Sequence, residues 1–368
     1  MPVIAAGSFD AVVADQDAHR IYLADRATQG VDVVDISAAT PRFAGTIALG
    51  AAPNGLALAP DQNRIYASVQ GGNVAVIDSG AATVLGTIAI DPVGGAADLI
   101  DYSPKTKSLY VGSDTNVVVV DTATQQVTQR FALTTPVEQP RYDPADGMLY
   151  VATPKKDSLV QIDPASGKTK RTYVLPKCRP KGVAINPARQ LAMLACGSSV
   201  AFVNLATGAH DVTRVVQGGD IVTYDPGADV FVVASPHDTA DSAVGAFTGG
   251  GGFLGSVAAS PVARAAVYDD AHGVVYAPGK GGLMNFAPAV CAPPPDWLRL
   301  AGGFSLFAVP LLAAIGFLVI YARVRQRRRN RPAGPTYEDL VEEDLAFERQ
   351  RMRALEDAIF GPGTEAAP

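Results

Sequence analysis

A short apolar segment recurs along the chain at intervals of about 40–45 residues, and this repeat constrains the fold more than any other feature. An apolar run of about six residues bounded by Gly, Pro, Asn or Asp is typical of a buried β-strand. The sequence therefore predicts several copies of one β unit. Seven segments share the pattern: RIYLAD (20–25), RIYASV (64–69), SLYVGS (108–113), MLYVAT (148–153), LAMLAC (191–196), VFVVAS (230–235) and VVYAPG (274–279).

The copies also agree position by position. A large apolar side chain, usually tyrosine, occupies one position in each copy: Tyr22, Tyr66, Tyr110, Tyr150, Met193, Val232 and Val275. A small residue follows two positions later in every copy. A turn residue precedes this aromatic position by six, except that the last is displaced by one: Gln16, Pro60, Pro104, Pro144, Pro187, Pro226 and Asp270. Proline suits a position where a strand ends, because it donates no backbone hydrogen bond.

Composition supports an all-β domain over residues 1–290. Charged residues make up only 18% of the chain, there are 36 glycines and 27 prolines, and no long helical pattern occurs before residue 297. Repeats of this length with four short strands each are typical of propellers, so we expect a seven-bladed β-propeller. Five copies end their third strand on a residue that accepts hydrogen bonds in turns: Asp35, Asp78, Asp121, Asp163 and Asn204.

With its spacing, small-residue column and aspartate turns, the chain resembles the YVTN-type β-propeller family over about residues 9–288. The first five copies match well, whereas the last two are degraded. A glycine-rich stretch, TGGGGF (248–253), stands where a fourth strand should begin, and the seventh copy shows only three strands. We expect the segment PVIAAGS (2–8) to supply the missing strand, because this would close the ring and remove its open edge.

One polar column stands at the entrance of the innermost strand of each predicted blade. In a propeller these positions surround one mouth of the central channel, so four acids and two bases would converge there and could hold a small cation or a polar ligand. A solvated rim would show polar residues at the same positions. The column is Asp10, Asn54, Asp98, Glu138, Lys181, Asp220 and Arg264.

Cys178 and Cys196 bracket one predicted hairpin, two residues away from direct opposition. A disulfide could join them, or both could be free thiols. Some sequences of the YVTN-like kind are similar to this one in carrying paired cysteines around this hairpin, which favours the bridge. A disulfide would suit an oxidising compartment. The pattern assigns no role to Cys291.

The β pattern stops at a Pro-rich linker over residues 291–299, and the next 23 residues, 300–322, contain no charge. This length of apolar sequence predicts a single transmembrane helix. The segment RVRQRRRNR (323–331) holds six arginines, whereas the other flank offers only Arg299. The positive-inside rule places the Arg-rich side in the cytoplasm and the propeller outside the cell membrane.

This topology conflicts with the start of the sequence, because residues 1–20 show no signal-peptide pattern. Either the true start lies upstream, or the chain is tail-anchored with a cytosolic propeller. We favour the first because the charge asymmetry is strong.

The remaining segment, 323–368, contains an expected amphipathic helix. Five apolar residues fall on one helical face: Val341, Leu345, Met352, Leu355 and Ile359. This face could contact a partner or the membrane surface, or the helix could be solvated throughout.

The charge disfavours one class of function. The chain carries a net charge of −6, and residues 1–298 hold 20 basic against 27 acidic residues, which disfavours nucleic acid as a partner. No phosphate loop, nucleophile elbow or metal-ligand spacing appears, so we assign no catalytic residue, metal or cofactor.

We therefore expect a membrane-anchored binding or scaffold module for a protein, an envelope component or a small ligand. The alternatives are a propeller hydrolase of lactonase type and a nucleic-acid-binding propeller, which the family resemblance keeps open.

Overall fold

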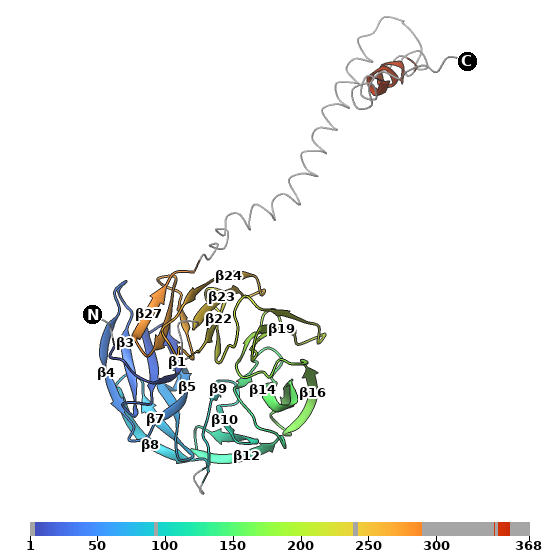
Figure 1. The fold of residues 1–368 in the computed structure, drawn as a ribbon. Coiled ribbons are helices and arrows are strands. Elements are labelled where there is room, and N and C mark those ends of the chain that lie inside the picture. Colours follow the sequence, from blue (N-terminus) through green and yellow to red (C-terminus); the bar gives the residue numbers. More distant parts are fainter. Residues whose placement is uncertain (1–3, 92–94, 238–241, 289–341, 343–344, 354–368) are drawn as a thin grey trace, which may run out of the picture. The chain divides into compact units, whose positions relative to one another are not determined.

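A computed structural model describes residues 4–91, 95–237, 242–288, 342 and 345–353. The chain divides into two units, Met1–Val290 and Cys291–Pro368. In the first unit, antiparallel sheets stand around a central axis, as Figure 1 shows. Seven sheets form from the described strands, and in each the strands pair in sequence order. The chain is thus a seven-bladed β-propeller, as the repeat predicts.

The first three blades each have four strands. Blade 1 contains β1 (Phe9–Asp15), β2 (Arg20–Asp25), β3 (Gly30–Asp35) and β4 (Arg42–Ala48). Blade 2 contains β5 (Pro53–Ala59), the 3-10 helix η1 (Pro60–Gln62), β6 (Arg64–Val69), β7 (Asn73–Asp78) and β8 (Thr83–Ala89). Blade 3 contains β9 (Ile100–Ser103), β10 (Ser108–Ser113), β11 (Asn116–Asp121) and β12 (Gln126–Ala132).

The next three blades repeat this arrangement. Blade 4 contains β13 (Pro140–Tyr142), β14 (Leu149–Thr153), the 3-10 helix η2 (Pro154–Lys156), β15 (Ser158–Asp163) and β16 (Lys168–Val174). Blade 5 contains β17 (Val183–Asn186), β18 (Leu191–Ala195), β19 (Val200–Asn204) and β20 (His210–Thr213). Blade 6 contains β21 (Val222–Asp225), β22 (Val230–Ser235), β23 (Ala243–Thr248) and β24 (Phe253–Ala258).

Blade 7 has three strands in the described region: β25 (Val267–Asp269), β26 (Val274–Gly279) and β27 (Gly282–Phe286). The expected fourth strand from residues 2–8 does not form in its described part, because residues 4–8 are not in a strand. Instead, Ile4 is buried in a core cluster that it shares with blade 1 and with Tyr276 of blade 7. This segment packs through an apolar side chain rather than through a backbone ladder.

The register of blade 7 corrects the aromatic position predicted there. Tyr276 pairs with Val267, just as Tyr22 pairs with Val13 and Tyr110 pairs with Asp101. Tyr276, not Val275, is therefore the equivalent residue, and Asp270 then precedes it by six as in the other blades. The prediction was wrong because Ala277, two positions after Val275, is a small residue as the repeat requires. The residue two positions after Tyr276 is Pro278.

Two features of the repeat explain why every copy folds alike. The tyrosines at the aromatic position are fully buried between blades, and Tyr110 stacks on Tyr142 of the next blade with ring centroids 6.0 Å apart. The Asp and Asn residues that end the third strands accept backbone hydrogen bonds within their own turns, as predicted. Asp78 accepts from Gly80 and Ala81, and Asn204 accepts from Thr207.

In the second unit, residues 345–353 are helical and exposed, and Leu345 and Met352 both face solvent. Val341, Leu355 and Ile359 of the predicted apolar face lie outside the described residues. The predicted linker 291–299 and apolar segment 300–322 also lie outside them. Among the residues that are described, no helix is long and apolar enough to cross a membrane.

Candidate functional site

The polar column lies at the start of the innermost strands, where all seven blades approach the channel axis. Asp10 and Asn54 belong to β1 and β5, and the other five stand two or three residues before the inner strand of their blade. We call this set the mouth ring. Its members are Asp10, Asn54, Asp98, Glu138, Lys181, Asp220 and Arg264.

Asp220 joins the two bases of the mouth ring. Its carboxylate lies 2.7 Å from the Arg264 guanidinium and 3.5 Å from the Lys181 ammonium. Gly182 allows this arrangement, because any Cβ there would collide with the Asp220 backbone carbonyl. With a side chain only 13% exposed and two cationic partners, Asp220 is a fixed bridge between three blades.

Asp10 is paired with a residue that the sequence did not single out. Arg26, which directly follows β2 of the same blade, donates to the Asp10 carboxylate at 2.7 Å. Burial raises the pKa of Asp10, and the Arg26 guanidinium lowers it in part. The corresponding position holds no base in blades 2 to 4, where it is Gln70, Asp114 and Pro154, so Arg26 is unusual within the repeat.

Asp98 and Glu138 form no ion pair with any described residue. Burial, reinforced by the carboxylates of Asp10 and Asp220, raises the pKa of Asp98 to about 6. Burial, reinforced by Asp98 and Asp220, raises the pKa of Glu138 to about 7. The acids of different blades therefore act on one another across the mouth. Asp98 accepts a hydrogen bond from the Leu99 backbone, and the Lys181 charge opposes the shift at Glu138, but neither acid has an ion pair among the described residues.

Asn54 adds an acceptor to the same end of the channel. Its Nδ2 donates to the Ala97 carbonyl at 2.6 Å, directly before Asp98 in the chain. Its Oδ1 is buried and has no hydrogen-bond partner among the described residues. A buried amide oxygen without a donor is costly, so this atom favours a donor from a bound molecule or a water.

A second layer of the channel lies three residues further along the inner strands, and sequence reasoning missed it. Asp101 of β9 and Arg141 of β13 face each other there, with 3.3 Å between the Arg141 guanidinium and the Asp101 carboxylate. The Asp101 carboxylate also accepts from the Tyr142 backbone at 2.7 Å. Burial raises the pKa of Asp101, and Arg141 opposes that shift. The pair lines a cavity of about 520 Å³ together with Val13, Thr223 and Tyr268.

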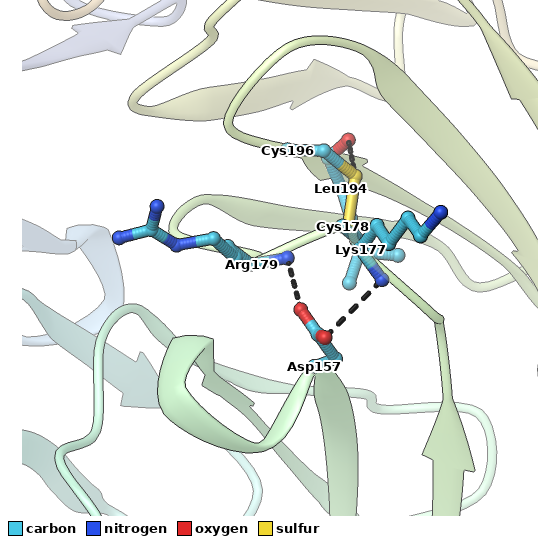
Figure 2. Close-up of a disulfide and its surroundings, with 6 residues drawn as sticks. All are labelled: Asp157, Lys177, Cys178, Arg179, Leu194 and Cys196. Carbon is cyan, nitrogen blue, oxygen red and sulfur yellow. Dashed lines mark hydrogen bonds between the residues drawn. A yellow bond between two sulfur atoms is a disulfide. The ribbon is translucent and has the colours of Figure 1, made fainter.

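The disulfide that the sequence left open is formed between Cys178 and Cys196 (Figure 2). Both residues are buried. Beside the bridge, the Asp157 carboxylate accepts the backbone N–H groups of Lys177 and Arg179, at 3.2 and 2.8 Å. These contacts fix the loop that leads to Lys181, so the bridge helps to place one base of the mouth ring.

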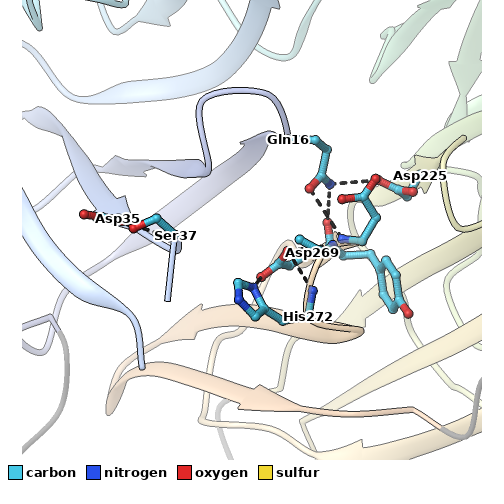
Figure 3. Close-up of polar contacts among 9 residues, drawn as sticks. Gln16, Asp35, Ser37, Asp225, Asp269 and His272 are labelled. Carbon is cyan, nitrogen blue, oxygen red and sulfur yellow. Dashed lines mark hydrogen bonds and ion pairs between the residues drawn. The ribbon is translucent and has the colours of Figure 1, made fainter. Parts of the chain in front are cut away.

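At the other end of β1, a single side chain ties the first blade to the last two (Figure 3). The Gln16 amide donates to the Asp225 carboxylate at 2.8 Å and to the Tyr268 carbonyl at 2.7 Å. Nearby, His272 lies 2.8 Å from the Asp269 carboxylate. These contacts close the ring, which explains why Gln16 replaces the proline found at this position in most blades.

Over the described part of the chain, no group of three or more His, Cys, Asp or Glu residues is arranged to hold a metal ion. The mouth ring gathers seven polar groups but spreads its carboxylates over four blades. Among the described residues, it contains two acids without an ion pair, one amide oxygen without a donor, and two bases joined by Asp220.

Comparisons with known proteins support the fold. No protein-family model matches the chain, and no curated protein matches it by sequence. Among solved structures it is similar to hydrazine synthase of Kuenenia stuttgartiensis, with a TM-score of 0.66 and 16% sequence identity. The match covers 79% of this chain and 98% of that one. At this identity the likeness shows the propeller fold alone.

Proposed function

We propose that this protein is a membrane-anchored, YVTN-like propeller that binds a small ammonium-bearing ligand at the mouth ring. The observation that carries the proposal is the pair of unpaired carboxylates, Asp98 and Glu138, on adjacent blades with raised pKa values. An ammonium group would offset their mutual repulsion and restore the hydrogen bonds that burial withholds.

The rest of the mouth ring indicates further features of this ligand. Asn54 Oδ1 needs a hydrogen-bond donor. The Lys181 ammonium is about half exposed and keeps donors free beyond its contact with Asp220. A ligand with a hydroxyl beside its ammonium group would offer a donor to Asn54 and an acceptor to Lys181. Ethanolamine is the simplest molecule with both groups.

The test is calorimetric titration of the full chain in detergent with ethanolamine at pH 8. The double variant Asp98→Asn with Glu138→Gln should weaken binding by about tenfold or more, since charged hydrogen bonds are worth about 1.5–3 kcal/mol. Asp211→Asn, on the exposed outer strand β20, is the matched control and should leave binding unchanged. Equal binding by both variants, or no binding by the natural chain, would contradict the proposal.

Membrane anchorage is a second part of the proposal. The 23 uncharged residues 300–322 and the six arginines of 323–331 support it, with the propeller outside the cell and the tail in the cytoplasm. Protease added to intact cells should digest the propeller and spare the tail. Protection of the propeller in sealed cells would favour the tail-anchored topology instead.

Metal analysis distinguishes the enzyme alternative from the proposed binding module. A propeller hydrolase of lactonase type would need a bound divalent ion. Stoichiometric calcium or zinc in the purified chain would favour that alternative over the binding module.

A further inference from the structure

The hydroxyl of Tyr22 in blade 1 is buried without an acceptor, although the same hydroxyl is satisfied in the next three blades. Tyr66 donates to Gln62 at 2.7 Å, and Tyr150 donates to Asp146 at 2.6 Å. Tyr110 lies 3.3 Å from the Thr106 hydroxyl. In these three blades the partner stands four residues before the tyrosine, whereas Tyr276, the equivalent residue of blade 7, shares with Tyr22 a buried hydroxyl without a partner among the described residues. In blade 1 the position of that partner is Ala18, and Tyr22 Oη has no acceptor for its proton in the described part of the chain, since the adjacent Arg20 guanidinium can only donate to it.

The side of blade 2 that faces Tyr22 also lacks the polar side chains that fill the equivalent space between blades 2 and 3. Between blades 2 and 3, Gln62 donates to both Tyr102 and Thr122, and the three residues close the junction. Between blades 1 and 2, the positions of Tyr102 and Thr122 are occupied by Leu58 and Ser79. The junction between blades 1 and 2 therefore lacks the polar network of its neighbour.

A cavity of about 510 Å³ opens at this junction. Its polar lining comes from Asp15, Asp17, Arg20, Tyr22, Asn63 and Ser79. We call it the blade 1–2 pocket. It lies at the end of β1 opposite to the mouth ring, so the two sites share no residue.

Arg20 is also released from its expected partner. Arg64, at the same position in blade 2, pairs with Asp78 at 3.0 Å. Arg20 stands opposite Asp35, but Asp35 is held by Arg42. Arg20 instead donates to the Ser79 carbonyl of blade 2 at 3.3 Å and forms no ion pair with any described residue. The pocket thus presents a guanidinium with unused donors.

These groups define the ligand chemistry. Burial raises the pKa of Tyr22, so its hydroxyl stays protonated and needs an acceptor. The Arg20 guanidinium beside it can only donate. Asp15 accepts the Ala18 N–H at 2.9 Å, and both it and the exposed Asp17 can accept further hydrogen bonds. Their carboxylates would repel an anion, whereas Arg20 would repel a simple cation. A hydroxyl both donates and accepts, so a neutral polyhydroxylated molecule satisfies all four side chains.

We propose that the blade 1–2 pocket binds a saccharide unit, with Tyr22 and Arg20 donating to its hydroxyl oxygens and Asp15 and Asp17 accepting from its hydroxyl groups. The cavity is in the size range of small-molecule sites. This site is independent of the ligand proposed for the mouth ring.

The experiment uses the full chain in a sugar-free detergent, with glucose, trehalose and N-acetylglucosamine as probes and saturation-transfer NMR as the readout. At least one probe should bind the natural chain at millimolar concentration. Tyr22→Phe removes only the donor and should weaken binding about fivefold to tenfold. Tyr66→Phe is the same change in blade 2, where the hydroxyl already has a partner, and should leave binding unchanged.

A second variant gives blade 1 the tyrosine partner that blade 2 has. Ala18→Gln places the acceptor of blade 2 into blade 1, so it should satisfy Tyr22, fill the pocket and abolish saccharide binding. Asp98→Asn in the mouth ring should have no effect, which keeps this test separate from that of the proposed function. The proposal is overturned if no probe binds, if Tyr22→Phe and Ala18→Gln both bind like the natural chain, or if phosphate or calcium displaces the saccharide.

Discussion

The mouth ring and the layer below it are built from the same inner strands, three residues apart. Asp101 is held by Arg141 and by a backbone N–H, inside regular strands. Asp98 precedes β9 in a loop and has no ion pair among the described residues. Both carboxylates have raised pKa values because both are buried, yet Asp101 has an ion pair, whereas Asp98 and its neighbour Glu138 have none among the described residues. Removing the partner of a buried acid is costly, whereas an acid without an ion pair is available to a ligand.

The largest expected effect comes from removing the disulfide. It tests whether the mouth ring and the layer below it are held in place by different contacts. Replacing Cys178 and Cys196 by serine removes a bridge that closes an 18-residue separation, which should cost about 3 kcal/mol of unfolding free energy. Because the bridge anchors the loop before Lys181, hydrogen exchange should rise at residues 177–182. Exchange at residues 100–103 in β9 should stay slow. Equal acceleration in both places would show that the layers are not held independently.

The next effect tests the ion pair between Asp101 and Arg141. Arg141→Met leaves the Asp101 carboxylate buried without its cation, and we expect a loss of about 2 kcal/mol at pH 8, reduced because the channel admits water. Denaturant unfolding measures this change. The loss should shrink at low pH, where Asp101 becomes protonated. Adding Asp101→Asn to Arg141→Met should recover most of the stability, and a double variant as unstable as the single one would refute the pairing argument.

The smallest effect concerns the unpaired acids. Because folding raises the pKa of Asp98 to about 6 and of Glu138 to about 7, the folded state binds more protons than the unfolded state between about pH 4 and pH 7. Their contribution to stability is therefore greatest below pH 4 and is lost as the pH rises through 6–7. Asp98→Asn with Glu138→Gln should flatten this profile and stabilise the protein at pH 8 by about 1 kcal/mol, a fraction of what the two pKa shifts would give in full, because solvent at the channel mouth screens both carboxylates. A destabilised double variant would mean that these acids have structural partners.

Much of the fold follows from local patterns. The period, the buried tyrosines and the turn-forming aspartates each act within one blade, so a reader of the sequence can find them without knowing which blades touch. The mouth ring was predictable for the same reason, since equivalent positions in a closed repeat must lie around one axis. The hydrogen bonds and ion pairs within the mouth ring were not predictable. Nothing in the sequence pairs Asp220 with bases of both neighbouring blades.

The sequence by itself determined seven β units, their order and the residues that surround the channel, because these depend on short-range alternation and on turn chemistry. Only the tertiary structure decided which side chains remain without partners. Asp98 and Asp101 look alike in the sequence, and so do Tyr22 and Tyr66, but their partners come from neighbouring strands, turns and blades. Gln16 shows the same principle at the closure of the ring, where it bonds to residues more than 200 positions away. Hydrogen bonds and ion pairs act over a few ångströms in space, so their presence or absence is fixed only when the blades have closed around the axis.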